Sequence, residues 1–284
     1  MEKIELLSFA KINLCLYVLG KRADGYHNIL SVMQAIDLAD KIELTKSSSG
    51  IKIECENPQI PCGKENLAYL AAETLFENYG IRGGVKIKID KKIPIASGLG
   101  GGSGNAAAVL KGLNRLYEVG LTDKDLTTLG AKIGSDVPFF FSKGQALVRG
   151  RGEIIQDIDL YSDYWLVLVK PSLEIRAAWA YQALKIGLTT KPAEVNLKIC
   201  RDKPGFFEEV SSWKNDLELG VFEEYPIIRS IKQGLISLGA VRASMSGSGP
   251  TVYGLFATES KAEEVKAETL KGDWQIYTTR PTPL

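Results

Sequence analysis

The sequence holds one histidine and four cysteines among 284 residues, so it is poor in the side chains that bind transition metals or form disulfides. His27 has no companion ligand nearby, and Cys15, Cys55, Cys62 and Cys200 form no C-x-x-C pair. Zinc sites and disulfide-stapled secreted domains both depend on such groupings. The sequence therefore argues against both classes of protein.

The chain also lacks an excess of charge of one sign and a long apolar run. Its 35 basic and 34 acidic residues leave a net charge of +1, whereas nucleic-acid-binding proteins carry a basic stripe. No apolar stretch approaches the ~20 residues that span a bilayer, and Glu2, Lys3 and Glu5 give a polar start. We expect a cytoplasmic protein, monomeric or homodimeric, without nucleic-acid or membrane partners.

Glycine, by contrast, is concentrated: five glycines fall within residues 98–104, directly before the helix-forming segment 106–117. Glycine amides approach an anion closely because no Cβ intervenes, and a helix N-terminus adds its positive dipole end. A flexible surface loop is the alternative, but so many glycines would make an entropically poor linker inside a domain. The pattern predicts a phosphate-binding loop.

Two common phosphate-binding motifs fit this loop poorly. Neither Gly20-Lys21-Arg22 nor Gly63-Lys64-Glu65 supplies the G-K-[ST] ending of a P-loop. The pattern Gly102-x-Gly104-x-x-Ala107 matches a dinucleotide fingerprint in form. That fingerprint should follow a strand at once, yet the predicted strand 85–89 ends about a dozen residues earlier.

Hydrophobic patterning predicts a strand-rich and then helix-rich first half, followed by a second half with helices on an antiparallel sheet, which is an α+β fold. Asn66 and Gly80 are expected to cap one helix, and Thr122 another. The predicted strands are 4–8, 12–20, 35–45, 51–54, 85–90, 164–170, 242–245 and 251–256, with a turn at 47–50. The predicted helices are 67–79, 106–117, 123–133, 176–185, 224–238 and 259–270. We place a domain boundary at residue 158, giving domains 1–158 and 159–284.

The string from Pro94 to Ala107, P-x-x-x-G-L-G-G-G-S-x-N-A-A, resembles an ATP-binding motif of the GHMP kinases. Further blocks follow the order of that family along nearly the full chain, at residues 10–14 with 22–27, 134–140, 215–218 and 244–250. The resemblance implies an ATP-dependent kinase with Mg²⁺. It also implies a two-domain fold, an N-terminal ribosomal protein S5 domain 2-like half and a C-terminal ferredoxin-like α/β plait, with the active site between them.

The resemblance implies that Asp136 takes the proton of the acceptor hydroxyl and that Lys11 is its partner. An opposite charge within a few ångströms favours the ionised carboxylate. The residues alone favour a turn or cap aspartate for Asp136 and an exposed-face strand lysine for Lys11.

ATP binding is assigned by the same resemblance to Asn66 and the glycine-rich segment. Asn66 is at least equally a helix N-cap. Ser103 can cap the helix or contact Mg²⁺ held mainly by the ATP phosphates. The family usually has a second serine where this chain has Gly104. The segment comprises Pro94, Ile95, Ala96, Ser97, Gly98, Leu99, Gly100, Gly101, Gly102, Ser103 and Gly104.

Acceptor binding is assigned to Asn13, Tyr26, His27 and Tyr181. The block at residues 22–27 resembles the corresponding block in one branch of the family. That branch phosphorylates a cytidine diphosphate-linked methylerythritol in the non-mevalonate isoprenoid route. The resemblance implies that aromatic rings stack on both faces of the cytosine and that a histidine forms hydrogen bonds with its edge. Two alternatives remain open. Another GHMP kinase would act on homoserine, mevalonate or a sugar, and a metabolite sensor on this fold would bind nucleotide without catalysis.

Overall fold

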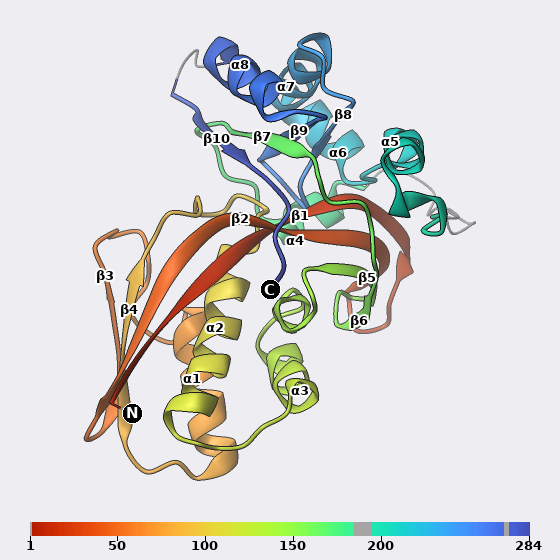
Figure 1. Cartoon of the computed structure of the whole chain (residues 1–284). Coiled ribbons are helices and arrows are strands. Elements are labelled where there is room, and N and C mark those ends of the chain that lie inside the picture. Colours follow the sequence, from red (N-terminus) through yellow and green to blue (C-terminus); the bar gives the residue numbers. More distant parts are fainter. Residues whose placement is uncertain (1, 185–194, 270–272) are drawn as a thin grey trace.

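The computed structural model describes residues 2–184, 195–269 and 273–284, and it contains two β-sheets, each covered by helices (Figure 1). The first sheet has six strands and is built from the first part of the chain. The second has four strands and is built from the last part. No helix within these ranges is both long enough and apolar enough to span a membrane.

The first sheet is organised around two long antiparallel strands, β1 (Lys3–Lys21) and β2 (His27–Ser47). One end of β2 also pairs with β4 and the other with β5, so the sheet order is β3-β4-β2-β5-β6 with β1 added on β2. The shorter strands are β3 (Gly50–Cys55), β4 (Gly84–Asp90), β5 (Gln145–Gly150) and β6 (Ile154–Asp157).

The helices α1 and α3 of the first part begin or end at the capping residues that the sequence predicts. Asn66 accepts a hydrogen bond from the Ala68 amide at the start of α1 (Leu67–Tyr79), and Gly80 ends it in the left-handed conformation. Thr122 and Asp125 form a reciprocal capping box on α3 (Asp123–Ile133). These predictions from capping residues are confirmed. A short 3₁₀ turn, η1 (Val137–Phe141), follows α3.

Helix α2 (Gly101–Leu116) begins five residues earlier than predicted, because the glycines themselves form its first turn. Glycine has a low helix propensity, so this segment on its own would favour a loop. Packing overrides that preference, because Gly101 and Gly104 are buried in the folded chain. A Cβ on Gly104 would lie 2.8 Å from the Phe9 carbonyl oxygen, so this helix approaches β1 more closely than an alanine would allow.

The second sheet is antiparallel in the order β10-β7-β9-β8, as expected for the second half. Its strands are β7 (Trp165–Lys170), β8 (Arg242–Met245), β9 (Val252–Phe256) and β10 (Gln275–Thr279), the last of which the sequence analysis missed. The helices are α4 (Ala177–Gln182), α5 (Lys203–Ser212), α6 (Glu218–Glu224), α7 (Pro226–Ser237) and α8 (Glu259–Thr269), with a 3₁₀ turn η2 (Ile199–Arg201). The predicted helix ends at Lys185 and Leu270 lie outside the described residues.

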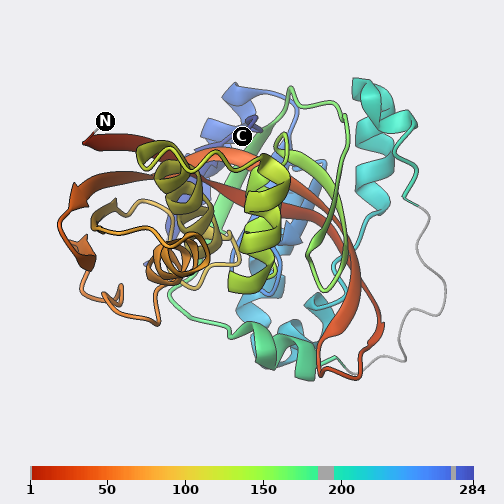
Figure 2. The same cartoon turned by 90° about the horizontal axis from the view of Figure 1, so that it is seen from below.

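The two parts meet along β1 and β2, which run from the N-terminal end to the second sheet (Figure 1). Ile12 and Leu14 of β1 share a buried cluster with Leu166 of β7 and Tyr253 of β9. Seen from below, α4 lies beside the tip of the β1–β2 hairpin (Figure 2). The division at residue 158 falls between the two sheets and stays a prediction.

One strand prediction was wrong. The segments 4–8 and 12–20 are one continuous strand, in which register shifts at Phe9/Ala10, Asn13/Cys15 and Val18/Gly20 interrupt the alternation that sequence analysis relies on. The predicted strand 51–54 is confirmed as β3, which pairs in parallel with β4. Pairing partners are decided by the tertiary fold and leave no local pattern.

Candidate active site

A cavity of about 980 Å³ opens where β1, β2, the start of α2, the turn before η1, helix α4 and the β8–β9 loop converge. It brings together nine of the predicted site residues: Lys11, Asn13, Tyr26, His27, Gly98, Gly100, Ser103, Asp136 and Tyr181. Its volume is within the range of small-molecule sites. Segments far apart in the sequence therefore form one site.

Lys11 lies at the centre of this cavity with its ammonium group surrounded by acceptors. The Nζ atom lies 2.7 Å from Asn13 Oδ1, 3.0 Å from the Gly98 carbonyl oxygen and 3.3 Å from Asp136 Oδ2. Its side chain is 4% exposed. A buried ammonium is stable only when it is paired and hydrogen-bonded, so Lys11 is not the exposed-face lysine that its sequence context alone indicates.

Asp136 stands at the edge of the cavity, between the end of α3 and η1. Its carboxylate makes no capping hydrogen bond and its side chain is 34% exposed, so it remains open to a ligand. The turn is anchored by the buried Pro138, Phe139 and Phe140. Lys111 of α2 donates to the Phe140 carbonyl oxygen at 2.7 Å, which ties the turn to the glycine-rich helix.

The N-terminus of α2 faces the same cavity without a side-chain cap. Its N-cap is Gly100, which has no oxygen to offer the first amides. The Gly104 amide is bonded to the Gly100 carbonyl, so the amides of Gly101, Gly102 and Ser103 precede the first intrahelical bond. Ser103 is inside the first turn and is not the cap. This end of α2 suits an anion.

The loop before α2 and the β8–β9 loop close over Lys11 from two sides. Ser246 donates its hydroxyl proton to the Gly98 carbonyl oxygen at 3.0 Å. Gly98 has φ +78° and a Cβ on it would collide with the Ser246 carbonyl oxygen. A Cβ on Gly247 would lie 3.3 Å from Lys11 Nζ. The two loops approach so closely only because both positions are glycine.

The aromatic residues occupy the other end of the cavity. The rings of His27 and Tyr181 are stacked, with centroids 5.3 Å apart and planes inclined by 15°. Tyr26 is 51% exposed, and the Arg151 guanidinium lies 5.2 Å from its ring centroid. Tyr26 and Tyr181 both line this cavity, so their role as the two stacking faces for a base stays a prediction.

Burial shifts the titration of both stacked rings. Burial, and secondarily Lys21, lowers the pKa of His27 below its ordinary value. Burial, and secondarily the charge of Asp136, raises the pKa of Tyr181. The imidazole is therefore neutral at pH 7, with one nitrogen donating and one accepting, and Tyr181 stays a phenol.

The structure places the remaining predicted ATP-binding residues outside the lining of this cavity. Asn66 accepts from the Ala68 amide and donates to the Pro61 carbonyl oxygen, so its predicted capping role is confirmed. Ser97 is buried and donates to the Pro94 carbonyl oxygen at 2.7 Å, which shapes the loop. The others are Pro94, Ile95, Ala96, Leu99, Gly101, Gly102 and Gly104.

Sequence analysis missed several lining residues, among them Lys21, Arg151 and Leu16. Strict alternation from Lys11 and Asn13 points to Cys15 as the next residue on this face. The register shift between Asn13 and Cys15 turns Leu16 to the cavity instead. Cys15 is fully buried, and burial raises the pKa of its thiol to about 12, so it is not a nucleophile.

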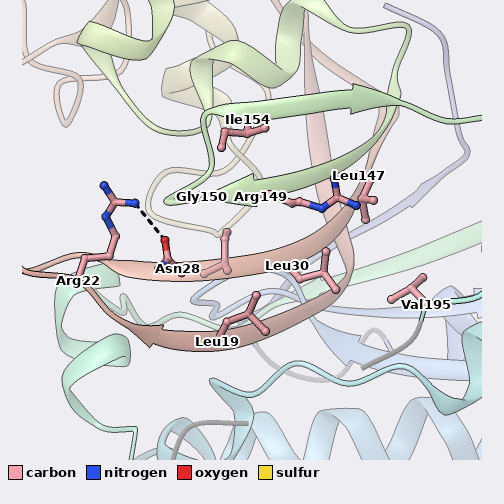
Figure 3. A pocket seen from close by; sticks show the side chains of 10 residues that line it. Leu19, Arg22, Asn28, Leu30, Leu147, Arg149, Gly150, Ile154 and Val195 are labelled. Carbon is pink, nitrogen blue, oxygen red and sulfur yellow. Dashed lines mark hydrogen bonds between the residues drawn. The ribbon is translucent and has the colours of Figure 1, made fainter. Parts of the chain in front are cut away.

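A second cavity, of about 560 Å³, lies on the other side of the β1–β2 hairpin tip (Figure 3). Arg22 bonds there to Asn28 Oδ1 at 3.0 Å and pairs with Asp24 at 3.0 Å. The Arg22 amide also donates to the Tyr26 carbonyl oxygen at 2.8 Å. The lining is mostly aliphatic and contains none of the predicted site residues. We therefore assign this region a structural role, in which Arg22 stabilises the turn that carries Tyr26 and His27.

The described residues contain no group of three histidine, cysteine or carboxylate side chains able to hold a metal ion. Ser103, in the first turn of α2, lines the cavity together with Ser135 and Ser248. Mg²⁺ keeps several waters and takes few protein ligands when it binds with a nucleotide. The residues present fit an ion delivered with ATP.

Two family models match the chain. The GHMP kinases N-terminal domain matches residues 66–144 and the GHMP kinases C-terminal domain matches residues 201–270. The first match contains α1, the glycine-rich start of α2 and Asp136, and the second contains the β8–β9 loop. The family relationship therefore covers both sides of the cavity.

Full-length relatives make the relationship more specific. The chain is 43% identical to the 4-diphosphocytidyl-2-C-methyl-D-erythritol kinase of Syntrophotalea carbinolica, covering 97% of this chain and 98% of that one. It is 42% identical to the kinase of that name from Geobacter metallireducens, covering 99% of both.

Solved structures agree. A crystal structure of 4-(cytidine 5'-diphospho)-2C-methyl-D-erythritol kinase superposes with a TM-score of 0.80 at 32% identity, over 98% of this chain and all of that one. A homoserine kinase from Cytophaga hutchinsonii shares the fold, with a TM-score of 0.78 at 17% identity, over 100% of this chain and 97% of that one. With nearly complete coverage at more than 40% identity, the chain belongs to the 4-diphosphocytidyl-2-C-methyl-D-erythritol kinase family of the GHMP kinases.

Proposed function

We propose that this kinase transfers the γ-phosphoryl group of ATP to the 2-hydroxyl of 4-diphosphocytidyl-2-C-methyl-D-erythritol in the non-mevalonate isoprenoid pathway. The observation that carries the proposal is one cavity that holds a lysine–aspartate pair, an uncapped helix N-terminus and a pair of stacked aromatic rings. These are the parts needed for an acceptor, a phosphate donor and a proton transfer.

The donor phosphates bind at the N-terminus of α2. The first-turn amides and the helix dipole neutralise part of their charge. Ser103 would contribute its hydroxyl to a phosphate oxygen or to Mg²⁺ bound with the nucleotide, and such an ion would supply positive charge that lowers the repulsion between the phosphates and the attacking oxygen. Asn66 and the segment 94–104 hold the rest of the nucleotide, with Asn66 also capping α1.

Asp136 accepts the proton of the acceptor 2-hydroxyl as that oxygen forms its bond to the γ-phosphorus. The bond from that phosphorus to the β,γ-bridging oxygen breaks, and ADP leaves with the electron pair. The Lys11 ammonium group faces three acceptors. It stabilises the ionised Asp136 and the developing charge on the attacking oxygen.

The cytidine end of the acceptor binds at Tyr26, His27 and Tyr181. A base enters between the exposed face of Tyr26 and the ring of Tyr181. The neutral imidazole then reads the base edge through one donor and one acceptor. Asn13 Nδ2 donates one of its two protons to Ser31, while Oδ1 accepts from Lys11, and the second amide proton is directed to the acceptor.

Other acceptors and a non-catalytic role are the alternatives. A kinase for homoserine or mevalonate has no use for the turn at Tyr26 and His27, and a sensor has no use for the Lys11–Asp136 pair. A cytoplasmic location, a monomeric or homodimeric state and the division at residue 158 stay predictions.

The test is an assay of ADP release with the cytidylylated acceptor, mevalonate and homoserine, each at the same concentration, with the product identified by ³¹P NMR. We expect turnover with the cytidylylated acceptor alone and a new phosphomonoester signal. Turnover with mevalonate or homoserine instead would contradict the proposed substrate. ADP release without a new phosphomonoester would contradict kinase activity.

A further inference from the structure

A chain of buried hydrogen bonds supports Lys11 from behind the cavity. The Ser31 hydroxyl, which is fully buried, donates to the Cys15 carbonyl oxygen at 2.5 Å. Asn13 Nδ2 donates to Ser31 Oγ at 2.8 Å, and Asn13 Oδ1 accepts from Lys11 Nζ at 2.7 Å. The chain ends on Asp136, 3.3 Å from the same ammonium group.

The direction of each bond is fixed by the protons available. A carbonyl oxygen only accepts, so the single proton of the Ser31 hydroxyl is committed to Cys15. Ser31 can then only accept from Asn13, which requires the amide nitrogen of Asn13 on that side. The amide oxygen must therefore face Lys11, whose ammonium group can only donate.

The irregular register of β1 and β2 brings these groups together. Asn13 pairs with Met33, so the two side chains share a face of the sheet, and Ser31 lies two residues before Met33 on that face. After the register shift, Leu16 is the residue of β1 opposite Ser31. The carbonyl of the bulged segment at Cys15 is thereby available to the serine hydroxyl.

Removing the Ser31 hydroxyl would release this orientation. A reversed Asn13 amide would aim its N–H groups at the Lys11 ammonium, so two donors would face one another with no acceptor between them. Lys11 would keep only Gly98 and Asp136 as partners. Its ammonium would no longer be fixed between the acceptor oxygen and Asp136, and misplacement of about 1 Å costs on the order of 10² in rate.

We propose that Ser31 is a positioning residue for phosphoryl transfer, acting through Asn13 on Lys11. It is buried, so it touches neither substrate. The inference rests on the proposed function of Lys11 and Asp136, but not on which alcohol is the acceptor. It predicts an effect on kcat and not on ATP binding, because the Ser31 hydroxyl is bonded to Cys15 and Asn13 and not to the first-turn amides of α2.

The test compares four single variants by steady-state kinetics and thermal unfolding. Ser31→Ala should lower kcat by about tenfold to a hundredfold and leave the KM for ATP within about twofold. Ser31→Thr keeps a hydroxyl at the same place and should restore most of kcat. Ser31→Cys keeps the shape with a weakly bonding thiol and should lose kcat like Ser31→Ala. Ser8→Ala is the matched control, since Ser8 is an equally buried serine of β1 whose hydroxyl has no partner.

A double-mutant cycle separates positioning from general damage to the fold. In an Asn13→Ala background, Ser31→Ala should cause no further loss of kcat, because the route from Ser31 to Lys11 is already broken. The proposal is overturned if Ser31→Ala or a folded Ser31→Cys keeps the wild-type kcat, if the KM for ATP rises in proportion, or if the losses multiply. These ratios are measured with whichever acceptor the wild-type enzyme phosphorylates, so a different acceptor would overturn the proposed function and leave this test intact.

Discussion

The pairing of Lys11 with Asp136 is tested most directly by Asp136→Asn. An amide of the same shape fills the place of the carboxylate but cannot take the proton of the acceptor hydroxyl. We expect the variant to bind both substrates and to lose turnover by on the order of 10² or more. A hundredfold loss corresponds to about 2.7 kcal/mol of activation free energy.

The structure predicts that this loss comes without unfolding. Lys11 keeps the Asn13 Oδ1 and Gly98 carbonyl acceptors at 2.7 and 3.0 Å when the carboxylate is gone. The Asp136 side chain is 34% exposed, so its ion pair is screened by water. The expected change in the free energy of unfolding is therefore less than about 1 kcal/mol, a small part of the ~5–15 kcal/mol of an ordinary domain.

Lys11→Met has the same expected effect on turnover and a larger one on stability. Methionine fills the buried volume but leaves Asn13 Oδ1 without its donor, whereas the Gly98 carbonyl oxygen keeps the Ser246 hydroxyl. One unsatisfied buried acceptor costs about 1–3 kcal/mol of unfolding free energy. The two variants should thus be similar in kcat and different in thermal stability.

The assay is ADP release coupled to NADH oxidation at saturating ATP and acceptor, for the wild type, both single variants and the double variant. Because the two groups act as one unit, the double variant should be hardly slower than either single one. Losses that multiply would refute the pairing. A purified, folded Asp136→Asn variant with wild-type turnover would refute the role of Asp136.

Three further predictions concern the glycine-rich helix and the histidine. Gly102→Val should fold normally, because the nearest atom to a Cβ at this position is Leu67 Cδ1 at 3.7 Å. Calorimetry with a non-hydrolysable ATP analogue should show that its affinity is reduced at least about tenfold, because the branched side chain blocks the approach of phosphate to the backbone. An unchanged affinity would count against backbone binding of phosphate. Gly104→Ser should lower the free energy of unfolding by about 1–3 kcal/mol, because its Cβ would lie 2.8 Å from the Phe9 carbonyl oxygen; an unchanged melting temperature would contradict this. The single histidine should titrate below 6.5 in an NMR experiment, and Lys21→Gln should move its pKa upward. Since the fold favours the neutral ring, stability should fall as the pH drops from 6.5 through that lower value; a pKa at or above 6.5 would show that His27 is not desolvated.

Local signals in the sequence were sufficient for much of the fold. Asn66, Gly80 and Thr122 set helix ends because caps act on backbone groups within three residues. The glycine density before Ala106 correctly indicated an uncapped helix start, although α2 takes in the glycines themselves. The helix boundary was missed because burial against β1 outweighs the low helix propensity of glycine.

The sequence by itself indicated the α+β fold and, through ordered motifs, the kinase family, and it predicted a phosphate-binding segment. Only the tertiary structure decided which groups meet. The burial of Lys11 between Asn13, Gly98 and Asp136, the stacking of His27 on Tyr181 and the support of Asn13 by Ser31 depend on a register shift in β1 and on contacts between distant segments. Local propensity acts over a few residues, whereas hydrogen-bond partners and burial are properties of the packed chain.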